Sequence, residues 1–224
     1  MRIVKPSAEL LWITPDAEQV IERSGRTCYK SEDAITKDSA GKFIRKIIAS
    51  GHHSVIEHAS ASFLFICDRG VTHELVRHRL VSYSQESTRY CNYGKNRFGN
   101  EITVIEPPGL TETQRDIWTK AVLCAEERYL LLLNNLGQTC PPQIARSVLP
   151  NCLKTEIVTT CNLREWRHIF KLRTSEAAHP QIREIMDIAL AKLFPLRPNA
   201  FYDFKPFIKN LSEEKGGPGE TDLL

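Results

Sequence analysis

The sequence has no apolar run long enough to cross a membrane. Its longest cluster of large apolar side chains, YLLLL at 129–133, covers five residues, whereas a membrane-spanning helix needs about 20. The chain also lacks a positively charged start followed by the apolar core of a secretory signal. With 42% hydrophobic and 25% charged residues, we expect a globular, cytoplasmic protein with no membrane partner.

The seven cysteines include no C-x-x-C pair. They are odd in number and lie singly along the chain, which argues against both a disulfide framework and a zinc knuckle. None of them lies in a sequence pattern that marks an activated thiolate. We therefore expect free thiols in a reducing compartment, and no cysteine is singled out as a nucleophile.

The glycine-rich loops that usually hold nucleotide phosphates are also missing, because neither G-x-G-x-x-G nor G-x-x-x-x-G-K-[ST] occurs. The chain is not strongly basic either: 30 Lys and Arg against 27 Asp and Glu give a net charge of +3 and a pI near 8.4. That balance argues against a dedicated nucleic-acid binder, so no nucleic-acid partner is expected. Any phosphate that the protein binds must be held by side chains.

The stretch HHSVIEH at 52–58 gathers three histidines and one glutamate but lacks the spacing of a zinc site. The zincin pattern needs two histidines four residues apart with a glutamate next to the first. His53 and His58 are five residues apart. We therefore predict no metal site there, and the alternative for this stretch is a polar loop after a helix end.

Apolar residues recur mainly at helical spacing, with a smaller strand component. The predicted helices cover residues 16–25, 40–51, 72–80, 111–136, 141–150, 163–173 and 181–194. Segments 58–67 and 155–160 predict strands, and D-R-G at 68–70 predicts a turn. We expect one α+β domain over residues 1–208, with a small sheet flanked by long helices, and a mobile tail over 209–224.

Local signals mark the ends of three helices. Gly51 has the position of a C′ glycine after the second predicted helix. Thr111 and Gln114 have capping-box spacing ahead of the longest helix, and Asn162 with Glu165 offers a cap for the helix at 163–173. These signals place those three ends.

Arginine is abundant in the segments that could form a site. Arg77 and Arg79 flank His78, with no acid closer than Glu74. Clustered like charges cost free energy unless an anion neutralises them, and the guanidinium fork suits a phosphate or a uracil-like edge. The other candidate arginines are Arg89, Arg146, Arg164, Arg167 and Arg173. For Arg146, Arg164 or Arg167 taken singly, a solvated position on a helix face is the alternative, and for Arg173 it is a helix-end cation that interacts with the dipole.

The triplet RHR at 77–79, followed by seven residues and then Ser87, resembles the RHR-x7-S signature of the flavin-dependent thymidylate synthases. The similarity extends to Arg89 and Tyr90. Three further segments are similar to segments of that family in the same order: GHHSVIEH at 51–58, ARSVLP at 145–150 and NLREWRHIFKLR at 162–173. The resemblance implies a homotetramer with an α/β fold unlike the Rossmann type, whose active sites lie between subunits and hold FAD and dUMP.

The resemblance also implies which residues form the site. It assigns FAD to Ser54, Glu57, Arg77, His78, Arg79, Gln85, Asn162, Leu163, Arg164 and His168. It assigns dUMP to Glu74, Leu75, Val76, Arg77, Gln85, Glu86, Ser87, Thr88, Arg89, Arg146 and Arg173. Arg173 is further implied as the catalytic group that polarises the uracil ring.

The reaction that the resemblance implies is the reductive methylation of dUMP to dTMP. Methylenetetrahydrofolate would supply the carbon and reduced FAD the hydride, with NADPH re-reducing the flavin. Two alternatives stay open. One is a thymidylate synthase that uses folate as its reductant, which would need an essential cysteine. The other is a non-catalytic nucleotide- or RNA-binding module built on the same basic loop, which bound flavin would distinguish from the enzyme.

Overall fold

The structure, a computed structural model, describes residues 1–134 and 140–206, which fall into two compact units. Unit 1 consists of Met1–Ala8, Leu64–Thr159 and Pro180–Ile185, apart from the undescribed residues. Unit 2 consists of Glu9–Phe63, Thr160–His179 and the described residues from Met186 onward. The single domain over 1–208 stays a prediction, and the tail at 209–224 lies outside the described residues.

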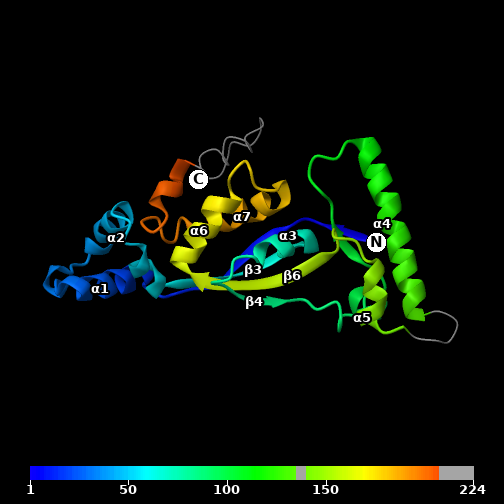
Figure 1. Cartoon of the computed structure of the whole chain (residues 1–224), viewed down its shortest axis with the longest axis horizontal. Helices are drawn as coiled ribbons and strands as arrows, with labels where there is room; N and C mark the ends of the chain where they lie inside the picture. The colour runs from blue at the N-terminus through cyan, green and yellow to red at the C-terminus, as the bar shows by residue number, and fades with distance from the viewer. Residues whose placement is uncertain (135–139, 207–224) are drawn as a thin grey trace, which may run out of the picture. The chain divides into compact units, whose positions relative to one another are not determined.

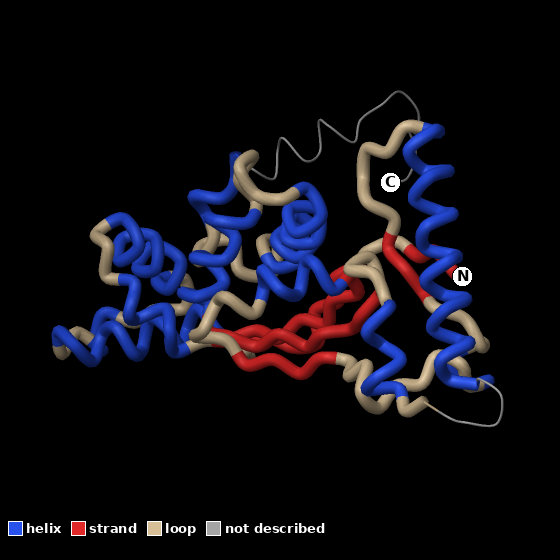
Figure 2. The backbone as a smooth tube through the Cα atoms, turned by 45° about the vertical axis from the view of Figure 1, so that its right-hand side comes forward, coloured by secondary structure: helices blue, strands red, loops and turns tan. Residues whose placement is uncertain are grey.

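Four strands form the larger sheet, in the order β2-β3-β6-β4 (Figures 1 and 2). They are β2 Ser7–Ile13, β3 Ser60–Asp68, β4 Ser82–Gln85 and β6 Lys154–Asn162. The predicted strands at 58–67 and 155–160 are thus confirmed as β3 and β6. β2 and β4 were missed. The segment Ser-Tyr-Ser-Gln of β4 has only one residue with high strand propensity, so its state depends on pairing with β6.

Unit 1 contains a second, parallel pair of strands and the longest helix. β1, Arg2–Val4, pairs with β5, Thr103–Ile105. α4, Glu112–Asn134, lies beside α5, Pro142–Ala145 (Figure 1). Its buried apolar side chains belong to the core of this unit. That core consists of Tyr93, Ile102, Val104, Val122, Tyr129, Leu133, Ala145 and Leu153.

The predicted capping box is confirmed at the start of α4. The Thr111 N–H donates to Gln114 Oε1 at 2.9 Å, and the Gln114 N–H donates to Thr111 Oγ1 at 3.3 Å. The predicted end of this helix, at residue 136, lies outside the described residues. The helix predicted over 141–150 is shorter than expected, because α5 passes into a 3₁₀ turn at Arg146–Val148.

The short helix before the RHR triplet begins and ends earlier than predicted. α3 is Arg69–Leu75, so the prediction of a turn at 68–70 is wrong. Asp68 is its N-cap and accepts the Val71 N–H at 2.7 Å, which brings Arg69 into the first turn. Beyond the helix end, the Tyr83 hydroxyl lies 2.6 Å from the Leu75 carbonyl oxygen. The triplet therefore lies in the turns after the helix.

In unit 2, α1 (Ala17–Tyr29) and α2 (Ser39–Ala49) lie side by side, followed by a 3₁₀ helix, η2 (His53–His58) (Figure 1). All the helices predicted here form, and Gly51 has the positive φ of 74° that its C′ position requires. α6 is Leu163–Arg173, and α7, Pro180–Leu193, runs from unit 1 into unit 2.

The core of unit 2 is aromatic and centres on Trp166. Its ring centroid lies 5.1 Å from that of Phe63 and 5.5 Å from that of Phe170. The buried indole N–H donates to the Ala61 carbonyl at 3.0 Å, so its polar atom is satisfied. This packing fixes one face of α6 and leaves the opposite face exposed.

Among the helices within 1–134 and 140–206, none has both the length and the apolar character needed to span a bilayer.

Replacing Asn162 with alanine is expected to lower the free energy of unfolding by about 1 kcal/mol. The Asn162 side chain accepts the Glu165 N–H at 2.8 Å and so confirms the predicted cap of α6. Urea denaturation of the flavin-free protein measures the change. Asp38→Ala is the matched control, because Asp38 precedes α2 without a side-chain cap hydrogen bond. Equal losses in the two variants would contradict the capping role.

Candidate functional site

The RHR triplet turns its two arginines and its histidine to different environments. Arg77 and Arg79 are exposed, whereas His78 is buried. The Arg77 and His78 N–H groups donate to the carbonyls of Glu74 and Leu75 at 3.2 and 3.1 Å, which fixes this turn. Within the residues that the structure describes, neither arginine forms an ion pair. Their charges are therefore available to an anionic ligand.

Leu75 and Val76, the two predicted dUMP-binding residues just before the triplet, differ in whether their side chains can contact a ligand. The Leu75 side chain is fully buried, so only its backbone could meet a ligand. Val76 is 41% exposed and could contact one through its side chain.

Gln85 and Glu86 are held at the end of β4 by neighbouring elements of unit 1. Gln85 Nε2 donates to Thr72 Oγ1 at 3.0 Å and to Thr155 Oγ1 at 3.3 Å. The Glu86 N–H donates to the Glu156 carbonyl at 2.8 Å. These contacts fix where the following turn begins.

The turn Ser87–Arg89 brings predicted substrate-binding residues next to Arg146. Arg146 Nη1 donates to the hydroxyl of the buried Thr88 at 3.1 Å. Ser87 Oγ accepts the Arg89 N–H at 3.3 Å, and the Arg89 guanidinium lies 5.4 Å from the Tyr90 ring centroid. Neither Arg89 nor Arg146 forms an ion pair in the described chain. Hydroxyls and guanidinium groups at one turn suit a phosphate.

A polar network beside this turn was not predicted. Glu86 Oε1 accepts the Tyr93 hydroxyl at 2.8 Å, and Glu86 Oε2 lies 3.0 Å from Lys154 Nζ. Glu156 lies 2.6 Å from the same ammonium group. The pattern of Lys154 and Glu156 two residues apart on a strand could have indicated a shared face. The spacing of residues along the strand could not have indicated their partner Glu86, which lies on a distant segment of the chain.

Burial and neighbouring charges change the pKa values of two members of this network, Tyr93 and Lys154. Burial, and then the negative charge of Glu86, raise the pKa of Tyr93 above its ordinary value. Burial alone would lower the pKa of Lys154, but hydrogen bonds to Glu156 and Glu86 outweigh it and the pKa is raised. Lys154 therefore keeps its charge at neutral pH.

In unit 2, two predicted flavin-binding residues lie on η2. Ser54 and Glu57 are three residues apart, which is one turn of a 3₁₀ helix, so they share a side. Glu57 forms an ion pair with Arg164 of α6. Ser54 and Arg164 line a cavity of 400 Å³ together with Tyr29 and Phe43. Aromatic and cationic groups around one cavity suit a planar anionic ligand.

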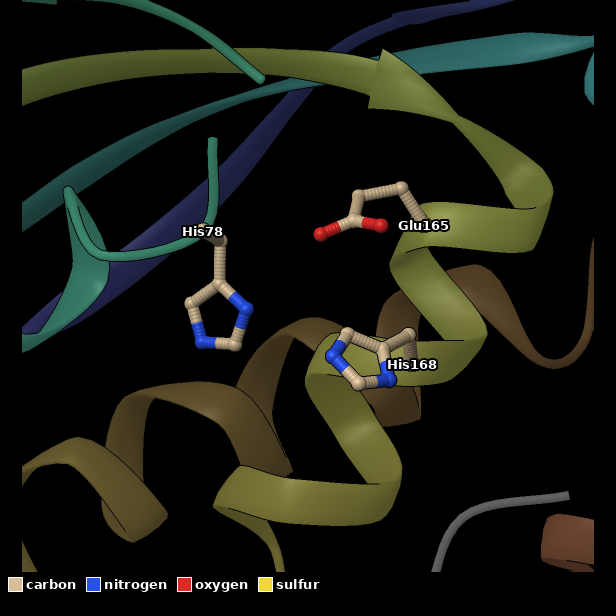
Figure 3. Close-up of side chains that lie close together, drawn as sticks. All are labelled: His78, Glu165 and His168. Carbon is tan, nitrogen blue, oxygen red and sulfur yellow. The ribbon is translucent and has the colours of Figure 1, made fainter. Parts of the chain in front are cut away.

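Two of the three predicted flavin-binding residues of α6 lie on its exposed face. Arg164 and His168 are exposed and one helical turn apart. Figure 3 shows His168 and Glu165 projecting from successive turns of α6; the third side chain drawn, His78, belongs to unit 1. Leu163 is buried and its N–H donates to the Ala59 carbonyl at 2.8 Å, so this residue mainly fixes the helix start.

Arg167 and Arg173 have different positions on the same helix. Arg167 is buried and pairs with Asp203 through two contacts of 2.7 and 2.6 Å, so it is not solvated and its charge is already balanced. Arg173 is the last residue of α6 and is half-buried.

The cysteines are free thiols, as predicted. Burial, together with the charge of Asp68, raises the pKa of Cys67 to about 12. Burial also raises the pKa of Cys161. A raised pKa keeps a thiol protonated at neutral pH, so these two side chains are poor nucleophiles.

Comparison with known proteins finds one family over most of the chain. The family described as thymidylate synthase complementing protein matches residues 9–199. The flavin-dependent thymidylate synthase of Mycolicibacterium gilvum is 37% identical over 203 residues, which cover 83% of this chain and 79% of that protein. The enzyme of the same name from Mycobacterium bovis is 38% identical over 213 residues, covering 86% and 82%.

Two solved structures have a similar fold. The UMP/dUMP methylase PolB from Streptomyces cacaoi, bound with 5-Br dUMP, has a TM-score of 0.78 and 25% identity, over 92% of this chain and 98% of that one. Thymidylate synthase X from Helicobacter pylori, with FAD and dUMP, has a TM-score of 0.72 and 21% identity, over 88% and 98%. The second likeness concerns the fold alone.

Iodoacetamide at about pH 8 is expected to modify the exposed Cys28 and Cys124 and to spare Cys67 and Cys161. Only a thiolate attacks the reagent, and the raised pKa of each buried thiol keeps it protonated. Peptide mass spectrometry measures each site. Denatured protein is the control, in which all four should react. Equal rates at Cys67 and Cys28 in the folded protein would contradict the burial argument.

Proposed function

The chain belongs to the thymidylate synthase complementing protein family, and we propose that it catalyses the reductive methylation of dUMP to dTMP with FAD as cofactor. The observation that carries the proposal is that Arg77, Arg79, Arg89 and Arg146 of unit 1 form no ion pair with any residue that the structure describes. A dianionic phosphate would neutralise such charges. Methylenetetrahydrofolate and NADPH are the co-substrates expected from the family.

The turn Ser87–Arg89 is proposed to bind the phosphate of dUMP. Arg146 reaches the turn through its contact of 3.1 Å with the Thr88 hydroxyl, and the guanidinium has further N–H groups to donate. Arg89 and the Ser87 hydroxyl add donors from the turn itself. Holding the phosphate by side chains agrees with the missing glycine-rich loops.

Ser54, Glu57 and Arg164 are proposed to hold FAD. The cavity of 400 Å³ beside Ser54 and Arg164 offers an aromatic wall and cationic donors, which fit part of a planar, anionic dinucleotide. When bound, FAD supplies the hydride of the reaction. The ion pair between Glu57 and Arg164 positions the guanidinium at the cavity.

Arg173 is proposed to polarise the uracil ring of dUMP. A guanidinium can donate two parallel hydrogen bonds to the carbonyl edge and stabilise negative charge that develops on the ring. A cation at a helix C-terminus that merely interacts with the dipole is the alternative role for this residue.

We further propose a homotetramer in which each active site takes residues from more than one subunit. The resemblance to the family supports this assembly. Arg77 and Arg79 are exposed and form no ion pair within residues 1–134 and 140–206, which agrees with a site that is completed by ligands and a second copy of the chain. A cytoplasmic location is proposed because all seven cysteines are free.

Purified protein is expected to carry flavin and to form dTMP from dUMP, methylenetetrahydrofolate and NADPH. Arg173→Lys should keep the fold and the flavin but lose at least about a hundredfold in dTMP formation, because an ammonium group lacks the planar fork. NADPH oxidation should persist. Product chromatography and flavin absorbance measure these quantities.

Arg128→Lys, at an exposed position on α4, is the matched control and should be silent. Near-native dTMP formation by Arg173→Lys would leave Arg173 as a helix-end cation. A colourless wild-type protein that gains no flavin would instead favour the non-catalytic binding module.

Mixing two inactive variants is expected to restore part of the activity if sites are shared. Arg77→Ala and Arg173→Ala subunits that exchange would form some sites with both native arginines. Activity is assayed against mixing ratio after subunit exchange, which mass spectrometry of the intact assembly verifies. Exchanged assemblies that stay inactive at every ratio would count against shared sites.

A further inference from the structure

A hydrogen bond between two side chains links the segments before and after the turn Ser87–Arg89. Glu86 precedes the turn and Tyr93 follows it, and the Tyr93 hydroxyl donates to Glu86 Oε1 at 2.8 Å. The other carboxylate oxygen, Oε2, lies 3.0 Å from Lys154 Nζ on β6. The Glu86 carboxylate therefore contacts both the segment after the turn, through Tyr93, and the sheet, through Lys154.

The three side chains that make these contacts are largely buried. The Glu86 side chain is 13% exposed, that of Lys154 is 18% exposed, and Tyr93 is buried. An ion pair at such a position is screened less than one at the surface, so breaking it costs more. Glu156, 47% exposed at its side chain, contributes the second carboxylate that keeps Lys154 protonated.

We propose that Glu86 and Lys154 are positioning residues of the substrate site, and that the Glu86 carboxylate does not touch the substrate. This inference rests on the proposed function and replaces the substrate-binding role that the family resemblance implied for Glu86. Both oxygens of the carboxylate already have donors, and a bare carboxylate beside a phosphate would repel it. Glu86 instead fixes the turn whose arginine and hydroxyls bind.

The surroundings of the Glu86–Lys154 ion pair explain why breaking it should change the position of the turn Ser87–Arg89. Glu86 and Lys154 line a cavity of 310 Å³, whereas Tyr93, which lines the same cavity, is also anchored in the core of unit 1. When the ion pair is removed, the Glu86 side chain loses its contact with β6, and only the Tyr93 side of the turn stays anchored in the core. The phosphate donors of the turn then lose their preorganisation, which weakens binding without changing the chemical step.

The test is a double-mutant cycle on Glu86→Gln and Lys154→Met. Each single variant should raise the KM for dUMP about tenfold, the order expected when a hydrogen bond to a charged group is lost. The turnover number should stay within about twofold, because the lost binding is common to ground and transition states. The double variant should be no worse than either single one. Calorimetric titration with dUMP checks affinity independently of turnover.

Three further variants test whether the effect depends on these particular contacts and guard against a charged variant that fails to fold. Tyr93→Phe removes only the hydroxyl and should raise the KM for dUMP a few-fold even if a charged variant fails to fold. Lys154→Arg keeps the ion pair and should restore near-native KM. Asp116→Asn with Lys120→Met breaks an exposed ion pair on α4 in the same unit and should change nothing.

Additive effects of Glu86→Gln and Lys154→Met on dUMP affinity would overturn the proposal, because they would mean independent contacts with the substrate. An unchanged KM in both variants, or a loss confined to the turnover number, would overturn it too. Wild-type protein that binds dUMP but forms no dTMP would refute the proposed function alone, since the titrations still test the positioning role.

Discussion

The register of strand β6 is the constraint on which the rest of the structure depends, because one face of the strand packs into the core and the other carries charged residues beside the substrate turn. One face buries Ile157 and Cys161, and the other presents Lys154 and Glu156. Successive side chains of a strand alternate, so a register shift of one residue would exchange these faces. It would bury the two charges and remove Lys154 from Glu86. The apolar pattern of β6 thus also holds the substrate turn in place.

The same strand determines where α6 begins. Its last residue, Asn162, accepts the Glu165 N–H, and the first helical residue, Leu163, is buried with its N–H bonded to Ala59. Once the start of the helix is fixed, its 3.6-residue period decides the rest. Trp166 enters the aromatic core, while Arg164 and His168 stay exposed.

Two arginines that stabilise the fold differ in their ion pairing from the arginines proposed to bind the phosphate of dUMP. In unit 2, Arg26 pairs with Glu22 and Arg167 with Asp203, so their charges are already balanced. In the described part of unit 1, Arg77 and Arg146 form no ion pair. A charge that the fold leaves unbalanced at a structured turn favours an anionic ligand. This contrast, together with the contact between Arg146 and the Thr88 hydroxyl, supports the proposed phosphate site.

Local signals determined the presence of most helices, two of their caps and the order of the family motifs, but not the ends of α3 and α5. The capping box of Thr111 and Gln114 and the cap of α6 were predictable because both partners lie within one helical turn. Only the tertiary structure decided which arginine is buried against Asp203, that β4 is a strand, and that Glu86 meets Lys154, 68 residues away. Contacts between distant segments depend on strand register and helix packing, which no local pattern specifies.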